Sequence, residues 1–134
     1  MSADKDRPPV VAVLNSNDDT VEMLRLMLEV EGMLAVSAHL DSIKRGEFDF
    51  GNFLREHDPK VIIFDIAPPY DRTWMLFRHF RGIDAAKGRT FVLTTTNRDR
   101  VVEIAKPDQD VFEIVGKPYD MGLIVGAVKK ALDI

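Results

Sequence analysis

Two short runs of uninterrupted apolar residues constrain the fold of this chain more than any other feature. They are Val10–Leu14 and Val61–Phe64, and neither alternates with polar residues. A strand that is buried on both faces has this pattern, which is typical of parallel sheets covered by helices. The two runs therefore predict the interior of an α/β domain with helices on both sides of its sheet.

The rest of the chain alternates helical and strand patterns. Further strands are predicted over 33–38, 90–95 and 111–115, and helices over 18–31, around 52–57, 74–81, 97–105 and from 120 onward. We expect Asp18 or Asp19 to cap the first helix and Gly32 to end it. The order predicts a (βα)5, doubly wound, five-stranded parallel sheet, with residues 10–134 as one domain after a polar tail over 1–9.

Two apolar clusters outside the strands bear on packing. The last predicted helix has an apolar stripe made of Leu123, Ile124, Ala127, Val128 and Ala131. Phe48, Phe50 and Phe53 lie close to two glycines, and they fit either packing beneath a loop or an exposed docking patch. The histidines His39, His57 and His79 share no metal-ligand spacing, so we interpret them as surface residues.

Composition excludes several classes of function. The 134 residues include no cysteine, which rules out disulfides, thiolate metal sites and thiol nucleophiles. With 18 basic and 22 acidic residues the net charge is −4, which does not favour a direct nucleic-acid partner. Neither a signal peptide nor an apolar run of about 18 residues is present, so we expect a cytoplasmic protein without a membrane partner.

Polar residues follow several of the predicted strands. They are Asn15 and Ser16, then Asp65, then Thr94–Thr96, and finally Lys117. The carboxyl ends of parallel strands meet at one edge of a sheet, where binding sites form. A carboxylate, a hydroxyl and an ammonium group on neighbouring loops are able to hold a phosphoryl group, with the carboxylate as its acceptor.

The residues at these strand ends resemble the receiver domain of bacterial two-component response regulators. The strand before Asp65 with Pro69 four residues later is similar to the phospho-acceptor segment, Phe91–Thr95 to the strand with the switch hydroxyl, and Lys117-Pro118 to the lysine turn. The resemblance implies that Asp65 accepts a phosphoryl group from a histidine kinase or a histidine phosphotransfer protein, assisted by Thr95 and Lys117. It implies no enzyme activity beyond self-catalysed phosphoryl transfer and dephosphorylation.

Three positions depart from that pattern. Receivers usually hold Mg²⁺ with two acidic residues after the first strand, where this chain has Asn15 and Ser16. The implied ligands are then Asp65, Asn15, Ser16 and the backbone carbonyl of Ala67, which predicts a weak or absent Mg²⁺ site because Mg²⁺ favours carboxylates. Ile114 occupies a position where receivers often have an aromatic residue that rotates on activation.

Three functions remain to be weighed. The first is a single-domain receiver that signals to an effector protein by contact, with a homodimer through the face of residues 97–105, 111–115 and the last helix. The second is a pseudo-receiver that binds proteins independently of phosphorylation. The third, an enzyme or nucleotide binder, lacks support because Ala67 replaces the second aspartate of a dehalogenase-type phosphatase and no glycine-rich phosphate loop is present.

Overall fold

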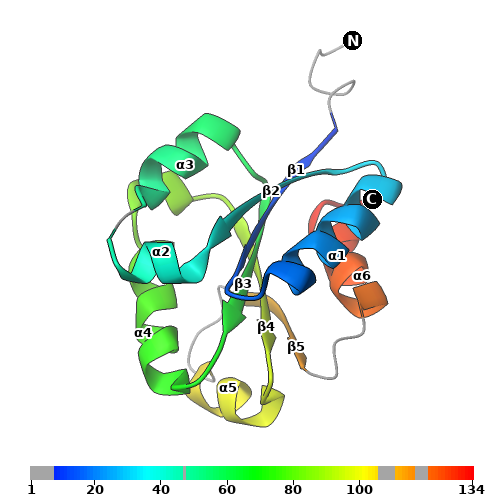
Figure 1. Ribbon diagram of the computed structural model, residues 1–134. Helices are drawn as coiled ribbons and strands as arrows, with labels where there is room; N and C mark the ends of the chain where they lie inside the picture. Colours follow the sequence, from blue (N-terminus) through cyan, green and yellow to red (C-terminus); the bar gives the residue numbers. More distant parts are fainter. Residues whose placement is uncertain (1–7, 47, 106–110, 117–120) are drawn as a thin grey trace.

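The computed structural model describes residues 8–46, 48–105, 111–116 and 121–134. Five parallel strands form one sheet in the order β2-β1-β3-β4-β5 (Figure 1). Their bounds are β1 Val10–Asn15, β2 Leu34–His39, β3 Val61–Ile66, β4 Thr90–Thr95 and β5 Val111–Gly116. The predicted doubly wound parallel sheet is confirmed.

Helices cover both faces of this sheet (Figure 1). The helices are α1 (Asp18–Val30), α2 (Leu40–Lys44), α3 (Phe50–His57), α4 (Tyr70–Arg81), α5 (Arg98–Ala105) and α6 (Met121–Ala131), with the 3-10 helix η2 (Asp84–Ala86) before β4. Helices α1 and α6 pack with one set of strand side chains, while α2, α3, α4 and α5 pack with the other set.

The central strands explain the uninterrupted apolar runs. In β1, Val11 and Val13 pack on the α1 and α6 side, whereas Ala12 and Leu14 pack on the opposite side. All four are fully buried. Successive strand residues point to opposite faces, so a strand with helices on both sides needs an apolar residue at every position.

Of the two expectations for the ends of α1, one was wrong and one is confirmed. Asn17, rather than Asp18 or Asp19, caps α1, because its side-chain oxygen accepts a hydrogen bond from the Thr20 amide at 2.9 Å. The two aspartates instead occupy the first turn, where their negative charge interacts favourably with the helix dipole. Gly32 follows the end of α1 with a φ of +86°, as expected for a helix stop.

The segment before β3 contains more helix than the sequence indicated. Helix α2 was not predicted, and its N-cap is His39, whose Nδ1 accepts from the Asp41 amide at 3.2 Å. Phe50 and Phe53 are buried in the core and Phe48 packs against it, so the docking-patch reading is wrong.

Helix α6 also differs from its predicted stripe, at two positions. Leu123 is 61% exposed, while Val125, which was not assigned to the stripe, is buried. Ile124, Ala127 and Val128 are buried as predicted.

Arg89, just before β4, connects the end of α3 to the segments that precede β3 and β4. Its guanidinium donates to the carbonyls of Ala85, Pro59 and Leu54 and to the Asp58 carboxylate, at 2.7 to 3.2 Å. None of the helices in the described ranges combines the length and the apolar character that a membrane span requires.

Candidate functional site

The candidate site lies where β1, β3 and β4 end. Asp65 pairs in register with Thr94 on β4, and Ile66 pairs with Thr95. On the other side of β3, the pairing of Leu14 with Phe64 brings Asn15 to the same level as Asp65. The order of the strands therefore collects predicted site residues from three separate segments at one edge of the sheet.

A buried hydrogen bond joins Asp65 to β4. The Thr94 hydroxyl donates to Asp65 Oδ1 at 2.7 Å. Asp65 is 7% exposed and Thr94 1% exposed, so this bond is largely shielded from water. A hydroxyl that donates to a carboxylate fixes the orientation of the carboxylate, which a nucleophile needs before it can attack.

Thr95, which the resemblance implied as the switch hydroxyl, is directed elsewhere. Its hydroxyl donates to the Ile66 carbonyl at 2.8 Å and accepts from the Asn97 amide at 3.2 Å. Neighbouring strand residues point to opposite faces, so Thr94 and Thr95 do not both reach Asp65. In this arrangement it is Thr94 that contacts the Asp65 carboxylate.

Asn15 and Ser16 already have partners within their own region. Asn15 is buried, and its Oδ1 accepts from the Asn17 amide at 2.8 Å, which closes an Asx turn before α1. Ser16 is exposed, and its hydroxyl donates to Asp41 Oδ1 on α2 at 3.4 Å. Asn15 and Ser16, which stand where receivers usually have two acidic residues, therefore each make a hydrogen bond within the protein.

The carbonyl of Ala67 is engaged as well. The buried Thr73 side chain, in the first turns of α4, donates to this oxygen at 2.7 Å. Sequence reasoning did not single out Thr73, which directly precedes the helix predicted over 74–81.

This set of donors does not fit a tight Mg²⁺ site. A divalent cation of this kind is usually held by one or two carboxylates with near-octahedral geometry. Asp65 is the single carboxylate among the four implied ligands, and the described residues contain no cluster of three or more His, Cys, Asp or Glu side chains suited to a metal.

Further contacts join the loops around this edge. The hydroxyls of Tyr70 and Thr96 lie 2.6 Å apart, and Arg100 on α5 donates to Asp71 on α4 at 3.2 Å. Sequence reasoning left Tyr70 uninterpreted. These contacts hold the beginning of α4 against the segment that follows β4.

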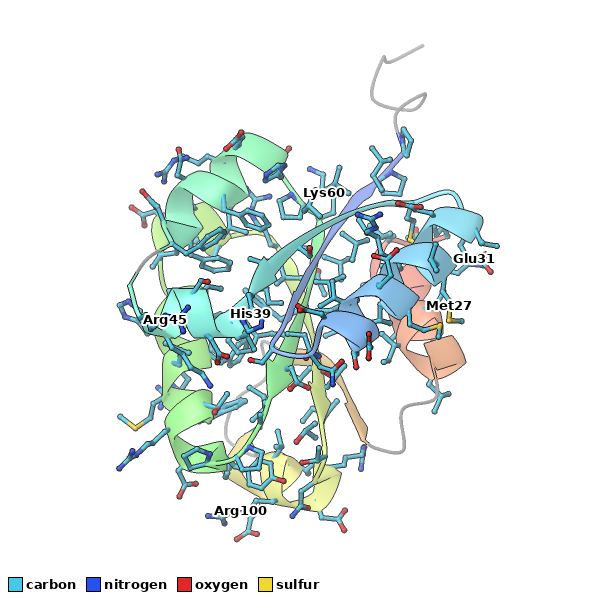
Figure 2. All side chains as sticks on the ribbon, viewed as in Figure 1. Met27, Glu31, His39, Arg45, Lys60 and Arg100 are labelled. Carbon is cyan, nitrogen blue, oxygen red and sulfur yellow. The ribbon has the colours of Figure 1, made fainter. Side chains whose placement is uncertain are left out.

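Three expected residues remain. Lys117 lies outside the described residues. Ile114 is partly buried against the core, and its carbonyl accepts from Arg98 Nε at 3.1 Å. His39, at the end of β2 (Figure 2), lies 4.0 Å from Asp18 and 3.7 Å from an oxygen of Asp41. Within the described ranges, it belongs to no group of three or more side chains that could hold a metal ion.

Comparison with known proteins identifies the architecture. No protein-family model and no curated protein matches the sequence. A response regulator from Thermotoga maritima is 17% identical with a TM-score of 0.72, and the match covers 95% of this chain and 99% of that one. A putative response regulator from Chloroflexus aurantiacus is 24% identical with a TM-score of 0.70, over 96% of this chain and all (100%) of that one.

A third structure is described as a CheY-like response regulator receiver domain and comes from Methylobacillus flagellatus. It is 13% identical with a TM-score of 0.66, and the match covers 92% of this chain and 98% of that one. These three likenesses extend over nearly the whole length of both partners. The chain therefore has the fold of response regulator receiver domains.

Proposed function

We propose that this chain is a receiver that accepts a phosphoryl group on Asp65 and passes the signal on by protein contact. The observation that carries the proposal is the buried Asp65–Thr94 pair at the carboxyl edge of a receiver fold. A carboxylate at this edge, on the central strand β3, is where an open parallel sheet places its reacting group.

The chemistry needs a donor with a labile phosphoryl group, such as a phosphohistidine. A carboxylate oxygen of Asp65 attacks phosphorus, an O–P bond forms, the P–N bond breaks, and the imidazole leaves with a proton. The Thr94 hydroxyl, 2.7 Å from Oδ1, is placed to bond a phosphoryl oxygen once the acceptor oxygen has reacted. Lys117 is proposed, by resemblance alone, to neutralise another oxygen.

The partners follow from this chemistry. A histidine kinase or a histidine phosphotransfer protein supplies the phosphoryl group, and an effector protein reads the result. The face formed by α5, β5 and α6 is proposed by resemblance as the surface for the effector.

We propose that Mg²⁺ contributes little to this reaction. The oxygens of Asn15 and Ala67 already accept protein hydrogen bonds, and Ser16 is bonded to Asp41. If the loop has receiver geometry, Asn15→Asp with Ser16→Asp raises Mg²⁺ affinity by at least about tenfold, since each added carboxylate strengthens a hard-cation site. Isothermal titration with MgCl₂ measures this directly.

One observation favours a second candidate, a pseudo-receiver that acts as a protein-binding adaptor. Asn15 closes the turn before α1, and Ser16 donates a hydrogen bond to Asp41 on α2, so both side chains have structural partners. A site organised in this way supports the fold and its surfaces without requiring phosphorylation.

Intact-mass spectrometry after incubation with a small phosphodonor separates the two candidates. The receiver predicts a gain of one phosphoryl group that Asp65→Asn abolishes and that persists when Mg²⁺ is chelated. The pseudo-receiver predicts no gain with or without Mg²⁺. A gain that survives in Asp65→Asn contradicts the assignment of the acceptor.

A further inference from the structure

A small pocket lies between α2 and α4, two helices that cover the same face of the sheet (Figure 1). Its volume is about 280 Å³, and its lining residues are Lys44, Pro69, Arg72, Thr73 and Leu76. Leu76 is only partly buried against the core, so with Pro69 it leaves an apolar wall open to the pocket. The α2–α4 pocket therefore combines an apolar wall with two cationic side chains.

The two cations of this pocket have no counter-charge among its lining residues. Lys44 and Arg72 are both exposed, and neither forms an ion pair with another residue of the described ranges. The chain as a whole has a net charge of −4, so this local excess of positive charge runs against its composition. A concave site lined by one sign of charge attracts a ligand of the opposite sign.

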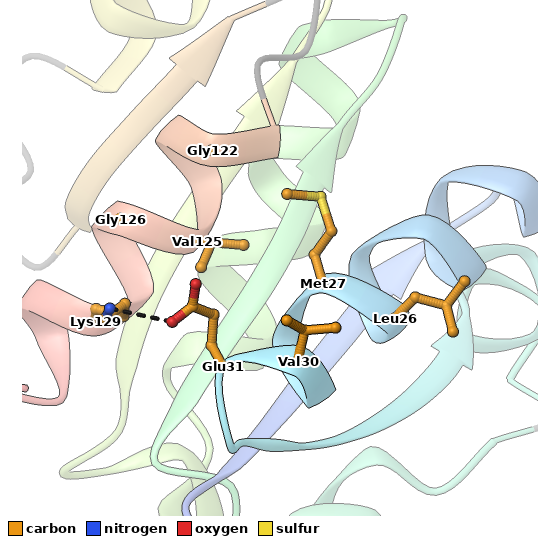
Figure 3. Close-up of a pocket in the computed structure, with 8 residues that line it drawn as sticks. All are labelled: Leu26, Met27, Val30, Glu31, Gly122, Val125, Gly126 and Lys129. Carbon is orange, nitrogen blue, oxygen red and sulfur yellow. Dashed lines mark hydrogen bonds and ion pairs between the residues drawn. The ribbon is translucent and has the colours of Figure 1, made fainter.

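The groove between α1 and α6 shows the opposite situation (Figure 3). Its lysine, Lys129, forms an ion pair of 3.2 Å with Glu31 of the same groove. That cation is neutralised within the chain, whereas a carboxylate that neutralises Lys44 or Arg72 has to come from another molecule. Charge complementarity therefore specifies an anionic occupant for the α2–α4 pocket.

Apolar surface continues beyond the pocket. Met75, the neighbour of Leu76 on α4, is 69% exposed. The pocket volume is close to the lower limit of about 300 Å³ for small-molecule sites, so a small anion that fits inside it leaves Met75 uncovered. A protein segment with an apolar side chain between acidic ones matches the apolar wall, the exposed Met75 and the two cations together.

Thr73 connects the pocket to the candidate site. Its side chain is part of the pocket lining, and its hydroxyl donates to the carbonyl of Ala67 at 2.7 Å. Ala67 comes two residues after Asp65. An occupant of the pocket therefore lies against the loop that follows Asp65.

We propose that the α2–α4 pocket binds an acidic segment of a partner protein, which places an apolar side chain against Leu76 and carboxylates against Lys44 and Arg72. The contact is small and exposed ion pairs add little affinity, so we expect a Kd of about 0.1–1 mM for an isolated segment. This surface differs from the face of α5, β5 and α6 inferred from the resemblance. Binding requires no phosphoryl group on Asp65, so the failure of one proposal leaves the other in place.

Nuclear magnetic resonance of the whole ¹⁵N-labelled chain tests the proposal, with a synthetic peptide of two leucines flanked by glutamates as the probe. Titration should shift amide signals of α2 and of the first turns of α4. Two control peptides, one with lysines for glutamates and one with serines for leucines, should each bind at least about tenfold more weakly. No shift up to several times the expected Kd, or equal binding of the serine peptide, overturns the proposal.

Charge reversal on the protein gives a reciprocal test. Arg72→Glu should weaken binding of the glutamate peptide by about tenfold. Arg78→Glu is the matched control and should leave the Kd unchanged, since Arg78 is an exposed arginine on the same helix that does not line the pocket.

Combining Lys44→Glu with Arg72→Glu should reverse the preference, so that the lysine peptide binds more tightly than the glutamate peptide. Circular dichroism and thermal unfolding confirm that each variant is folded. Equal losses from Arg72→Glu and Arg78→Glu, or a double variant that still prefers the glutamate peptide, overturn the proposal.

Discussion

The hydrogen bond from Thr94 to Asp65 gives a prediction that is independent of phosphorylation. Thr94→Val keeps the shape of the side chain and removes its hydroxyl, so that Asp65 Oδ1 loses a donor at a site where both residues are less than a tenth exposed. Bonds to charged groups are worth about 1.5–3 kcal/mol. We therefore expect the free energy of unfolding to fall by about 2 kcal/mol, and Tm to fall by roughly 8 °C.

A double-mutant cycle with Asp65→Ala identifies the cause of this loss. Urea denaturation of the wild type, Thr94→Val, Asp65→Ala and the double variant should give a coupling energy of about 1.5–2 kcal/mol between the two positions. The matched cycle with Thr95→Val should give less than about 0.5 kcal/mol, because Thr95 donates to the Ile66 carbonyl instead. Equal coupling in the two cycles, or coupling of Thr95 alone, would refute the assignment of Thr94 as the residue bonded to Asp65.

Three other predictions concern contacts that stabilise the fold. Arg89→Met should lower the free energy of unfolding in urea by about 2–4 kcal/mol, because three partly buried carbonyls lose their donor. A loss below about 0.5 kcal/mol would contradict the role of Arg89. The hydrogen bond from Arg89 holds the pKa of Asp58 below its ordinary value of 3.8. The stability that this hydrogen bond provides is complete at a pH above 3.8. It is lost as the pH falls through the lowered pKa that Asp58 has in the folded state. Because Asp58 is largely exposed, this loss of stability at low pH should stay under about 1 kcal/mol. It should vanish in Asp58→Asn, and an unchanged pH dependence of stability in that variant would exclude this contribution of Asp58. Asn17→Ala should cost about 1 kcal/mol in thermal unfolding and Asn17→Asp much less; equal losses would argue against side-chain capping of α1.

The sequence was sufficient to predict the sheet because the signal for a doubly buried strand is local. Val10–Leu14 and Val61–Phe64 could not face water on either side, and a parallel sheet with two helical layers satisfies that requirement. The position of Asp65 at the edge of the sheet follows from its place at the end of such a run.

The partners of individual side chains were harder to predict. Three consecutive threonines after Leu93 contain no amphipathic signal, so the register with β3 alone determines that Thr94 and not Thr95 meets Asp65. Likewise, Asn17, Asp18 and Asp19 are all good capping residues, and the cap depends on where the backbone turns.

Short elements were also missed. Helix α2 has five residues, which is less than two turns and too short for a clear periodicity. Its two buried residues, Leu40 and Ile43, have the three-residue spacing of a helix. Two apolar residues at this spacing are also common in loops, so the spacing did not identify a helix.

The central claim, that the Asp65 carboxylate is the phospho-acceptor, is tested most directly by locating the modified residue. Treatment of the phosphodonor-labelled chain with borohydride reduces an acyl phosphate on aspartate to homoserine, which tandem mass spectrometry locates in the digested peptide. The account predicts homoserine at position 65 in the wild type and its absence after Asp65→Asn. Homoserine at another aspartate, or none at any position under conditions that label an established receiver, would contradict it.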